Sequence, residues 1–158
     1  GYMLTSPLQL AVMAARLANG GKAVTPHLVA PFPGEREHRP SLGFDAQHLA
    51  IVRSAMSGVV NEQIGTAYAA RIQKEGFEMA GKTGTAQVRH ISESERQEGV
   101  ITNEALPWRE RDHALFAGFA PIANPRYAVA VIVEHGGSGA HMAAPIARDI
   151  LLECQSRP

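Results

Sequence analysis

The chain has 158 residues, 45% of them hydrophobic, so it can form one domain, or a large part of one, with a buried core. Its 15 lysines and arginines balance its 15 aspartates and glutamates, which argues against a nucleic-acid partner because no overall positive field exists. Cys154 is the only cysteine, and no cysteine–histidine group has the spacing of a metal site, so we expect neither an internal disulfide nor a cofactor.

The first predicted element is an amphipathic helix. Thr5 or Ser6 can cap its amino end, and Pro7 suits its first helical position. Asn19-Gly20-Gly21 ends it. Apolar residues at spacings of three and four predict its core-facing stripe, formed by Leu10, Met13 and Leu17.

A loop and a second helix follow. Residues 22–42 contain several prolines and charges, which indicates a short extended piece over 24–29 and then an exposed loop. Asp45 can cap the second helix, and Gly65-Thr66 marks a break before a short helical turn over 67–72. The predicted core stripe of this second helix consists of Leu49, Val52, Met56 and Val59.

The second half of the chain predicts strands. Residues 77–88 alternate as a strand does, apart from two glycines, and such glycines often mark a close approach to the backbone. Residues 89–112 carry charges of both signs and are predicted to be a long solvated loop. Residues 114–120 and 127–134 are two strong strands in a hairpin. After a glycine-rich turn we expect a final helix with one apolar face of Met142, Ile146 and Ile150.

This order of elements predicts an α+β fold in which helices pack on a three-stranded antiparallel sheet. We expect residues 1–158 to form part of one domain, helical over 1–75 and strand, hairpin and helix over 76–158. An exposed edge of such a sheet could pair with a second copy of the chain.

The candidate functional residues are Lys82, Thr83, Gly84 and Thr85 on the first predicted strand. Serine acyl-transferases that act on D-Ala-D-Ala peptides and β-lactams use a Lys-Thr-Gly element. A lysine ammonium can attract a substrate carboxylate, threonine hydroxyls can hydrogen-bond it, and a glycine lets a substrate backbone approach. A backbone N–H on the strand can donate to an oxyanion. The alternative is an ordinary edge strand with a solvated lysine.

Two other groups are weaker candidates. The turn around Ser138 lies near a helix start, but it is not a Gly-x-Ser-x-Gly element, so a flexible strand-to-helix turn is the preferred interpretation. His135 and His141 have no metal-binding spacing and no evident third ligand. We therefore expect no metal site there.

Several blocks along the chain resemble, in order and spacing, the C-terminal half of the transpeptidase domain of class B penicillin-binding proteins, and most closely the elongation-type penicillin-binding protein 2. They are residues 1–11, 19–21, 25–29, 80–87, 113–121 and 143–147. The resemblance implies the penicillin-binding and serine β-lactamase-like fold. It also implies a serine D,D-transpeptidase that cross-links peptidoglycan stem peptides and is acylated by β-lactams.

The resemblance also implies roles for individual residues. Lys82 would belong to the catalytic hydrogen-bond network, Thr83, Gly84 and Thr85 would bind substrate, and the Thr85 backbone N–H would form half of the oxyanion hole. The implied partners are stem peptides, β-lactams and the cell-wall elongation machinery, and the implied location is the periplasmic face of the inner membrane. No apolar run approaches the roughly 20 residues of a membrane span, so we expect any anchor to lie outside this sequence.

The serine nucleophile is not among these residues. The family's Ser-x-x-Lys element is missing, because the residues three positions before the lysines are Asn19, Arg71 and Met79. Its Ser-x-Asn element is missing too, because the residues two positions before the asparagines are Leu17, Val59, Ile101 and Ile122. In the family both elements lie upstream. We therefore expect a fragment that is inactive alone.

Two alternatives stay open. One is a noncatalytic module of the same fold that senses β-lactams or binds peptide, and the other is a carboxypeptidase with the same strand.

Overall fold

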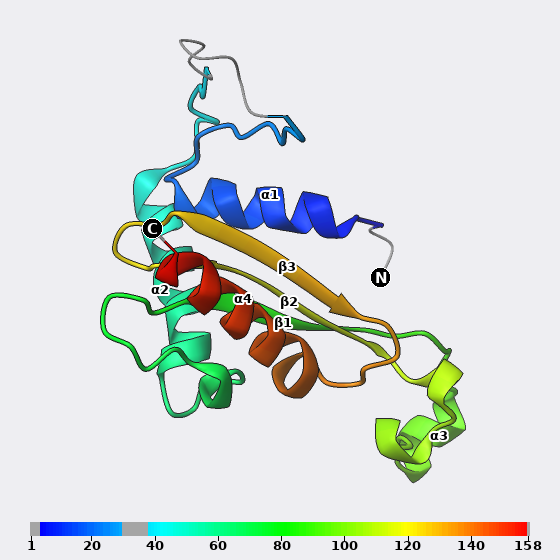
Figure 1. The fold of residues 1–158 in the computed structure, drawn as a ribbon. Helices are drawn as coiled ribbons and strands as arrows, with labels where there is room; N and C mark the ends of the chain where they lie inside the picture. The colour runs from blue at the N-terminus through cyan, green and yellow to red at the C-terminus, as the bar shows by residue number, and fades with distance from the viewer. Residues whose placement is uncertain (1–3, 30–37, 158) are drawn as a thin grey trace.

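The computed structural model of the chain describes residues 4–29 and 38–157. Within these residues, helices pack around a three-stranded antiparallel sheet (Figure 1). The predicted α+β fold class is therefore confirmed. The α-helices and strands are α1 (Pro7–Ala18), α2 (Ala46–Asn61), α3 (Glu93–Glu98), α4 (Ala144–Ser156), β1 (Ala80–Ala86), β2 (His113–Ala120) and β3 (Tyr127–Val133).

The two N-terminal helices begin where their capping residues predict. The Ser6 side chain accepts a hydrogen bond from the Gln9 backbone N–H, and the Gln9 side chain accepts one from the Ser6 N–H, so α1 starts with a capping box. Asp45 accepts hydrogen bonds from the N–H groups of Gln47 and His48 at the start of α2. These local signals set the ends of both helices.

The strands follow the order β1-β2-β3. In this register Lys82 pairs with Ala117, and Ala86 pairs with His113. Because successive side chains of a strand alternate between faces, Lys82 lies on the opposite face of the sheet from Thr83 and Thr85. The first predicted strand is shorter than expected, since β1 covers only Ala80–Ala86 of the predicted 77–88.

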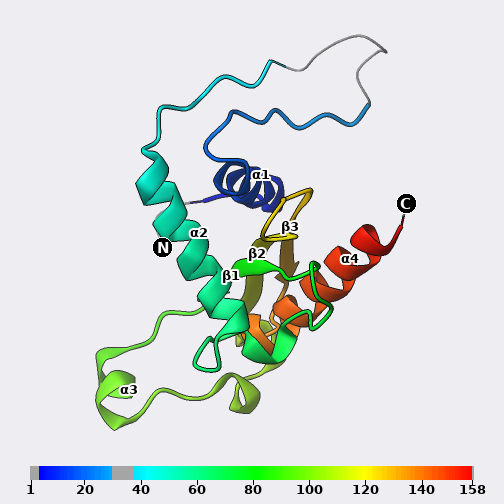
Figure 2. The same cartoon turned by 90° about the vertical axis from the view of Figure 1, so that its left-hand side faces the viewer.

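Helix α1 lies over one face of the sheet and α4 over the other, while α2 lies beside β1 (Figure 2). Ala18 of α1 and Met56 of α2 pack with Phe119 on the face that carries Lys82. On the other face Phe116 packs with Leu151 of α4. The edge strand β1 is thus bordered by α2, while β3 forms the other edge of the sheet.

The final helix turns a different face to the core than the sequence indicates. Met142, Ile146 and Ile150 share a face, but they are 44%, 41% and 44% exposed. The side chains that pack against the sheet are mainly alanines, which let the helix approach closely: Ala143, Ala144, Ala147 and Leu151. The same holds for α1, where Met13 is 45% exposed and the buried residues are Ala14 and Ala18.

The segment between β1 and β2 is also more ordered than predicted. It contains the short helix α3 and two 3₁₀ turns, Asn103–Ala105 and Trp108–Glu110. None of these three elements has a buried residue, but Leu106 between the two 3₁₀ turns is buried. The predicted long loop is therefore solvated over most of its length but contains regular elements. We call residues 89–112 the excursion.

Candidate functional site

The candidate site is the outer edge of β1. Two carbonyls just before β1 show to which side its backbone groups point. The Glu78 oxygen faces the β2 side, where it accepts a hydrogen bond from the Ile122 N–H. The Met79 oxygen faces the opposite side, where it accepts one from the Asn61 side chain of α2. Backbone groups of successive strand residues point to alternate sides. Odd-numbered residues of β1 therefore turn their N–H and C=O groups away from β2.

The Lys-Thr-Gly-Thr residues follow this alternation. The Thr83 carbonyl accepts a hydrogen bond of 2.9 Å from the Lys82 ammonium, which has curled over the outer edge of the strand. Residue 85 is odd-numbered as well, so the backbone N–H of Thr85 also points to that outer edge. One strand edge thus presents an ammonium, hydroxyls and a backbone donor, a set that suits an extended ligand with a carboxylate.

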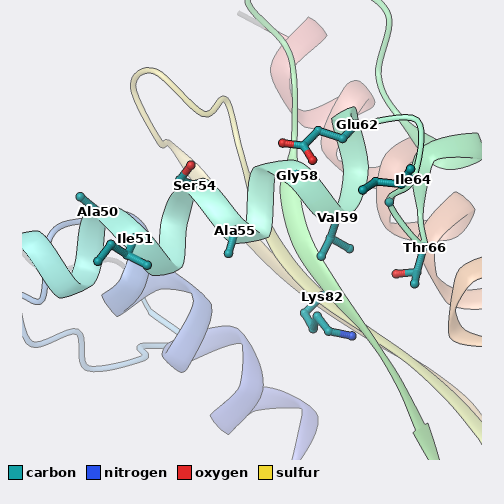
Figure 3. A pocket seen from close by; sticks show the side chains of 11 residues that line it. Ala50, Ile51, Ser54, Ala55, Gly58, Val59, Glu62, Ile64, Thr66 and Lys82 are labelled. Carbon is teal, nitrogen blue, oxygen red and sulfur yellow. The ribbon is translucent and has the colours of Figure 1, made fainter.

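A groove of about 720 Å³ lies between α2 and Lys82. Figure 3 shows Val59, Thr66 and Lys82 around this space. Small residues of α2, including Ala55 and Gly58, keep it open. Among the described residues that line it, Lys82 is the one basic side chain and Glu62 the one acidic side chain. An anion that enters the groove would therefore meet this one ammonium.

Three polar groups meet at Thr83. Its hydroxyl oxygen lies 3.2 Å from the Thr66 hydroxyl and 3.4 Å from the Lys82 ammonium. Sequence reasoning placed Lys82 and Thr83 together but assigned Thr66 only to a chain break. No local signal links Thr66 to Thr83, because the contact joins residues 17 positions apart.

The turn that carries Thr66 is fixed against α2. A Cβ atom on Gly65 would lie 2.4 Å from the carbonyl oxygens of Gly58 and Val59, so only glycine fits. The N–H of Ala67 donates to the Val59 carbonyl at 2.9 Å. The hydroxyl of Thr66 is therefore held near Thr83 by backbone contacts.

The strand is also supported from its other face. A Cβ atom on Gly139 would lie 2.4 Å from the Leu115 oxygen and 2.5 Å from the Gly84 oxygen, so the π-helical turn Gly139–Ala143 presses on the backbone of β1. Ser138 caps this turn by accepting a hydrogen bond from the His141 N–H. This contact gives Ser138 a structural function.

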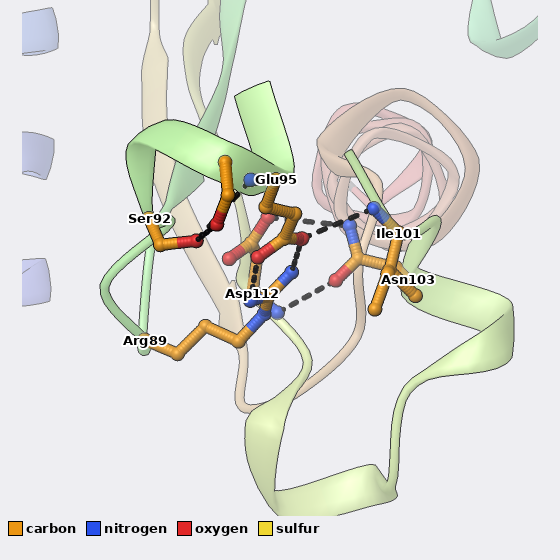
Figure 4. A network of polar contacts seen from close by, with 7 residues as sticks. Arg89, Ser92, Glu95, Ile101, Asn103 and Asp112 are labelled. Carbon is orange, nitrogen blue, oxygen red and sulfur yellow. Dashed lines mark hydrogen bonds and ion pairs between the residues drawn. The ribbon is translucent and has the colours of Figure 1, made fainter. Parts of the chain in front are cut away.

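The excursion leaves the sheet just beyond Thr85 and is held by a polar network (Figure 4). Arg89 forms a bidentate ion pair with Glu95, which also accepts a hydrogen bond from the Ile101 N–H. The hydrogen bonds from Arg89 and then from Ile101 lower the pKa of Glu95 to about 2. Asn103 and Asp112 exchange a reciprocal pair of hydrogen bonds.

The excursion is tied to the end of the hairpin as well. The His113 Nδ1 atom accepts a hydrogen bond from the His135 backbone N–H, and the His135 ring lies against Trp108 with ring centroids 4.5 Å apart. Gly137 N–H donates to the Asp112 carbonyl. Throughout the described parts of the chain, no group of three or more histidine, cysteine, aspartate or glutamate side chains could hold a metal ion.

The family model of the penicillin binding protein transpeptidase domain matches residues 1–152. The chain belongs to this family. Within it the chain is of the class B, PBP2/MrdA type. The predicted resemblance is therefore confirmed.

Curated relatives are about four times longer than the chain. It is 35% identical over 161 residues to the peptidoglycan D,D-transpeptidase MrdA of Salmonella typhimurium LT2, covering 96% of this chain and 25% of the relative. With MrdA of Acinetobacter baumannii it shares 37% identity over 169 residues, covering 100% of this chain and 24% of the relative. The chain thus spans about a quarter of the transpeptidases it matches.

Solved structures of penicillin-binding proteins share the fold. Pseudomonas aeruginosa PBP2 in complex with WCK 5153 matches with a TM-score of 0.69 and 36% identity, over 98% of this chain and 30% of that one. The PBP2–MreC complex of Helicobacter pylori gives 0.74 and 28%, over 98% and 26%. The imipenem acyl-enzyme of penicillin-binding protein A from M. tuberculosis gives 0.68 and 28%, over 99% and 32%.

Among the residues that the structure describes, no helix has the length and apolar character to cross a membrane.

Proposed function

We propose that this chain supplies the substrate-binding strand of a peptidoglycan D,D-transpeptidase that cross-links stem peptides by serine acyl transfer and is acylated by β-lactams. The observation that carries the proposal is the outer edge of β1, where Lys82, Thr83 and Thr85 present cationic, hydroxyl and backbone donors together. Relatives named D,D-transpeptidases and an acyl-enzyme structure in the family support it.

Each residue has a role that its chemistry can perform. The Lys82 ammonium attracts the ligand carboxylate and favours the deprotonated state of groups near the nucleophile. The hydroxyls of Thr83 and Thr85 hydrogen-bond that carboxylate, and Gly84 leaves room for the ligand backbone. The Thr85 N–H, directed to the open edge, donates to the oxyanion of the tetrahedral intermediate.

The nucleophile of this reaction belongs to another part of the longer protein. The sequence contains neither Ser-x-x-Lys nor Ser-x-Asn, and both elements lie upstream in the family's pattern. The chain alone is accordingly expected to be inactive. The reaction requires no metal or other cofactor.

The proposed partners follow from the family. Stem peptides and β-lactams bind along β1, and the whole protein works with the cell-wall elongation machinery at the periplasmic face of the inner membrane. The H. pylori PBP2–MreC complex supports such an association.

Intact mass after incubation with a penicillin tests the proposal. The samples are this chain and a longer protein that carries it together with the upstream transpeptidase sequence. We expect the longer protein to gain the mass of one penicillin and this chain to gain none. Acylation of this chain alone would overturn the assignment of the nucleophile, with Ser138 as the first residue to examine.

A noncatalytic module of the same fold is the second candidate, favoured by the lack of a nucleophile in these residues. A longer protein that binds penicillin reversibly, without a covalent adduct, would support it. A β-lactam sensor would instead be acylated, so turnover of a D-Ala-D-Ala peptide must separate it from the enzyme. In that assay a carboxypeptidase releases D-Ala without forming a cross-link.

A further inference from the structure

The hydroxyl of Thr66 contacts the hydroxyl of Thr83, a proposed substrate-binding residue. We propose that Thr66 is a positioning residue that orients the Thr83 hydroxyl toward the ligand carboxylate. This inference rests on the proposed function of β1.

A threonine hydroxyl has one proton to donate and two lone pairs to accept. The Lys82 ammonium can only donate, so Thr83 accepts from it at 3.4 Å. Between Thr83 and Thr66, at 3.2 Å, either hydroxyl can be the donor.

A bound carboxylate would fix which of the two hydroxyls is the donor. An ionised carboxylate only accepts hydrogen bonds, so Thr83 must give it its single proton. Thr66 must then donate to Thr83, which completes the chain Thr66 to Thr83 to carboxylate. Each hydroxyl in such a chain polarises the next one and strengthens its hydrogen bond.

The position of Thr66 makes it suited to this role. Its side chain is exposed at the rim of the groove, but its backbone is fixed, because Gly65 packs without space for a Cβ against the carbonyls of Gly58 and Val59. A donor that is already in place costs little conformational entropy when the ligand binds. A water at the same position would have to be immobilised.

The role predicts an effect on binding and little effect on bond formation. The carboxylate lies away from the carbonyl that is attacked, where the Thr85 N–H is the proposed donor. Removing the Thr66 hydroxyl should therefore weaken the noncovalent complex that precedes acylation. The rate constant of acylation within that complex should stay nearly unchanged.

The test uses Thr66→Val, which keeps the shape but removes the hydroxyl, and Thr66→Ser, which keeps the hydroxyl, in the longer protein. Stopped-flow measurements with a fluorescent penicillin separate the dissociation constant from the acylation rate constant. We expect Thr66→Val to raise the dissociation constant about 5-fold to 10-fold, the size of one lost hydrogen bond. Thr66→Ser should have the dissociation constant of the unmodified protein. Thr5→Val, whose hydroxyl donates to the Ser6 carbonyl ahead of α1, is the matched control.

A second ligand distinguishes hydrogen bonding from packing. With a penicillin analogue in which a hydrogen replaces the carboxylate, Thr66→Val and the unmodified protein should have equal dissociation constants, because Thr83 then has no acceptor on the ligand. If both ligands lose affinity to the same extent, or if Thr66→Val behaves as the unmodified protein with both, the inference is overturned. If the unmodified protein does not react with penicillin at all, the proposed function itself fails. Thr66→Ala provides the same comparison should Thr66→Val not fold.

Discussion

Lys82 lies exposed on an edge strand, and its ammonium contacts the carbonyl and hydroxyl of the next residue, Thr83. An exposed lysine of this kind adds little to stability, because water solvates it almost as well. Its position instead puts one positive charge where α2, the Thr66 turn and β1 meet. We therefore expect its replacement to affect the reaction and not the fold.

Lys82→Gln tests this expectation in the longer protein. The second-order rate constant for acylation by penicillin should fall at least about 100-fold, because the charge-assisted contact to the carboxylate and the support of the catalytic network are both lost. The thermal midpoint should stay nearly unchanged. Lys74→Gln is the control, since its ammonium lies 3.6 Å from the Phe77 ring centroid and does not line the groove. A normal acylation rate in Lys82→Gln would contradict the assigned role.

Gly139 provides a prediction about stability. A Cβ atom at this position would clash with the backbone oxygens of Gly84 and Leu115, which cannot rotate away as a side chain could. Gly139→Ala should destabilise the chain by about 1–3 kcal/mol, as overpacking does, with a lower thermal midpoint by circular dichroism. Gly58→Ala is the comparison, because the atoms nearest to its Cβ would be the end of the flexible Glu62 side chain, which is exposed. That substitution should be neutral or mildly stabilising in a helix.

At the scale of elements, the helix ends and the strands were predictable because their signals are local. Ser6 and Asp45 cap the helices that follow them, and β2 and β3 are apolar enough to be recognised alone. The buried faces of α1 and α4 were not predictable from large apolar side chains. Close packing against the sheet selects alanines there, so Met13 and Ile146 are left at the surface.

The excursion was not predictable for a different reason. A six-residue helix such as α3 has too few hydrogen bonds to be stable alone. Its order depends on tertiary contacts, including the Arg89–Glu95 ion pair and the hydrogen bond from Gly137 to Asp112. The candidate site was likewise predictable only in part. The motif located Thr83, whereas only the fold could bring Thr66 to it.

The Glu95 contacts predict how the excursion responds to acid. Because the folded pKa of Glu95, about 2, lies below its usual value of 4.5, the ion pair stabilises the excursion above pH 4.5. This contribution is lost as the pH falls from 4.5 through 2. A carbon-13 titration of the Glu95 carboxyl should have its midpoint near pH 2. In Arg89→Gln the midpoint should move toward 4.5, and an unchanged midpoint would show that the ion pair does not form.

At the scale of the whole molecule, β3 forms an edge of the sheet without a lysine or proline within the strand to block pairing. We expect this chain in isolation to associate with itself in a concentration-dependent way, measured by analytical ultracentrifugation. Ile132→Lys should weaken the association by placing a charge on that edge. Ile64→Lys, at a 92% exposed residue that lines the groove on the β1 side of the sheet, should not. A chain that stays monomeric at high concentration would rule out pairing through this edge.

The register of β1 and β2 has a consequence for how such proteins can diverge. Ala86 and His113 are paired neighbours, so the excursion leaves and re-enters the sheet at one place. Its length can therefore change without moving Lys82 relative to Ala117, because strand pairing fixes that register. Insertions and deletions in residues 89–112 could alter the surroundings of Lys82 while β1 keeps its geometry. The connection between β1 and β2 is therefore a position where the sequence can vary in evolution while the sheet stays the same.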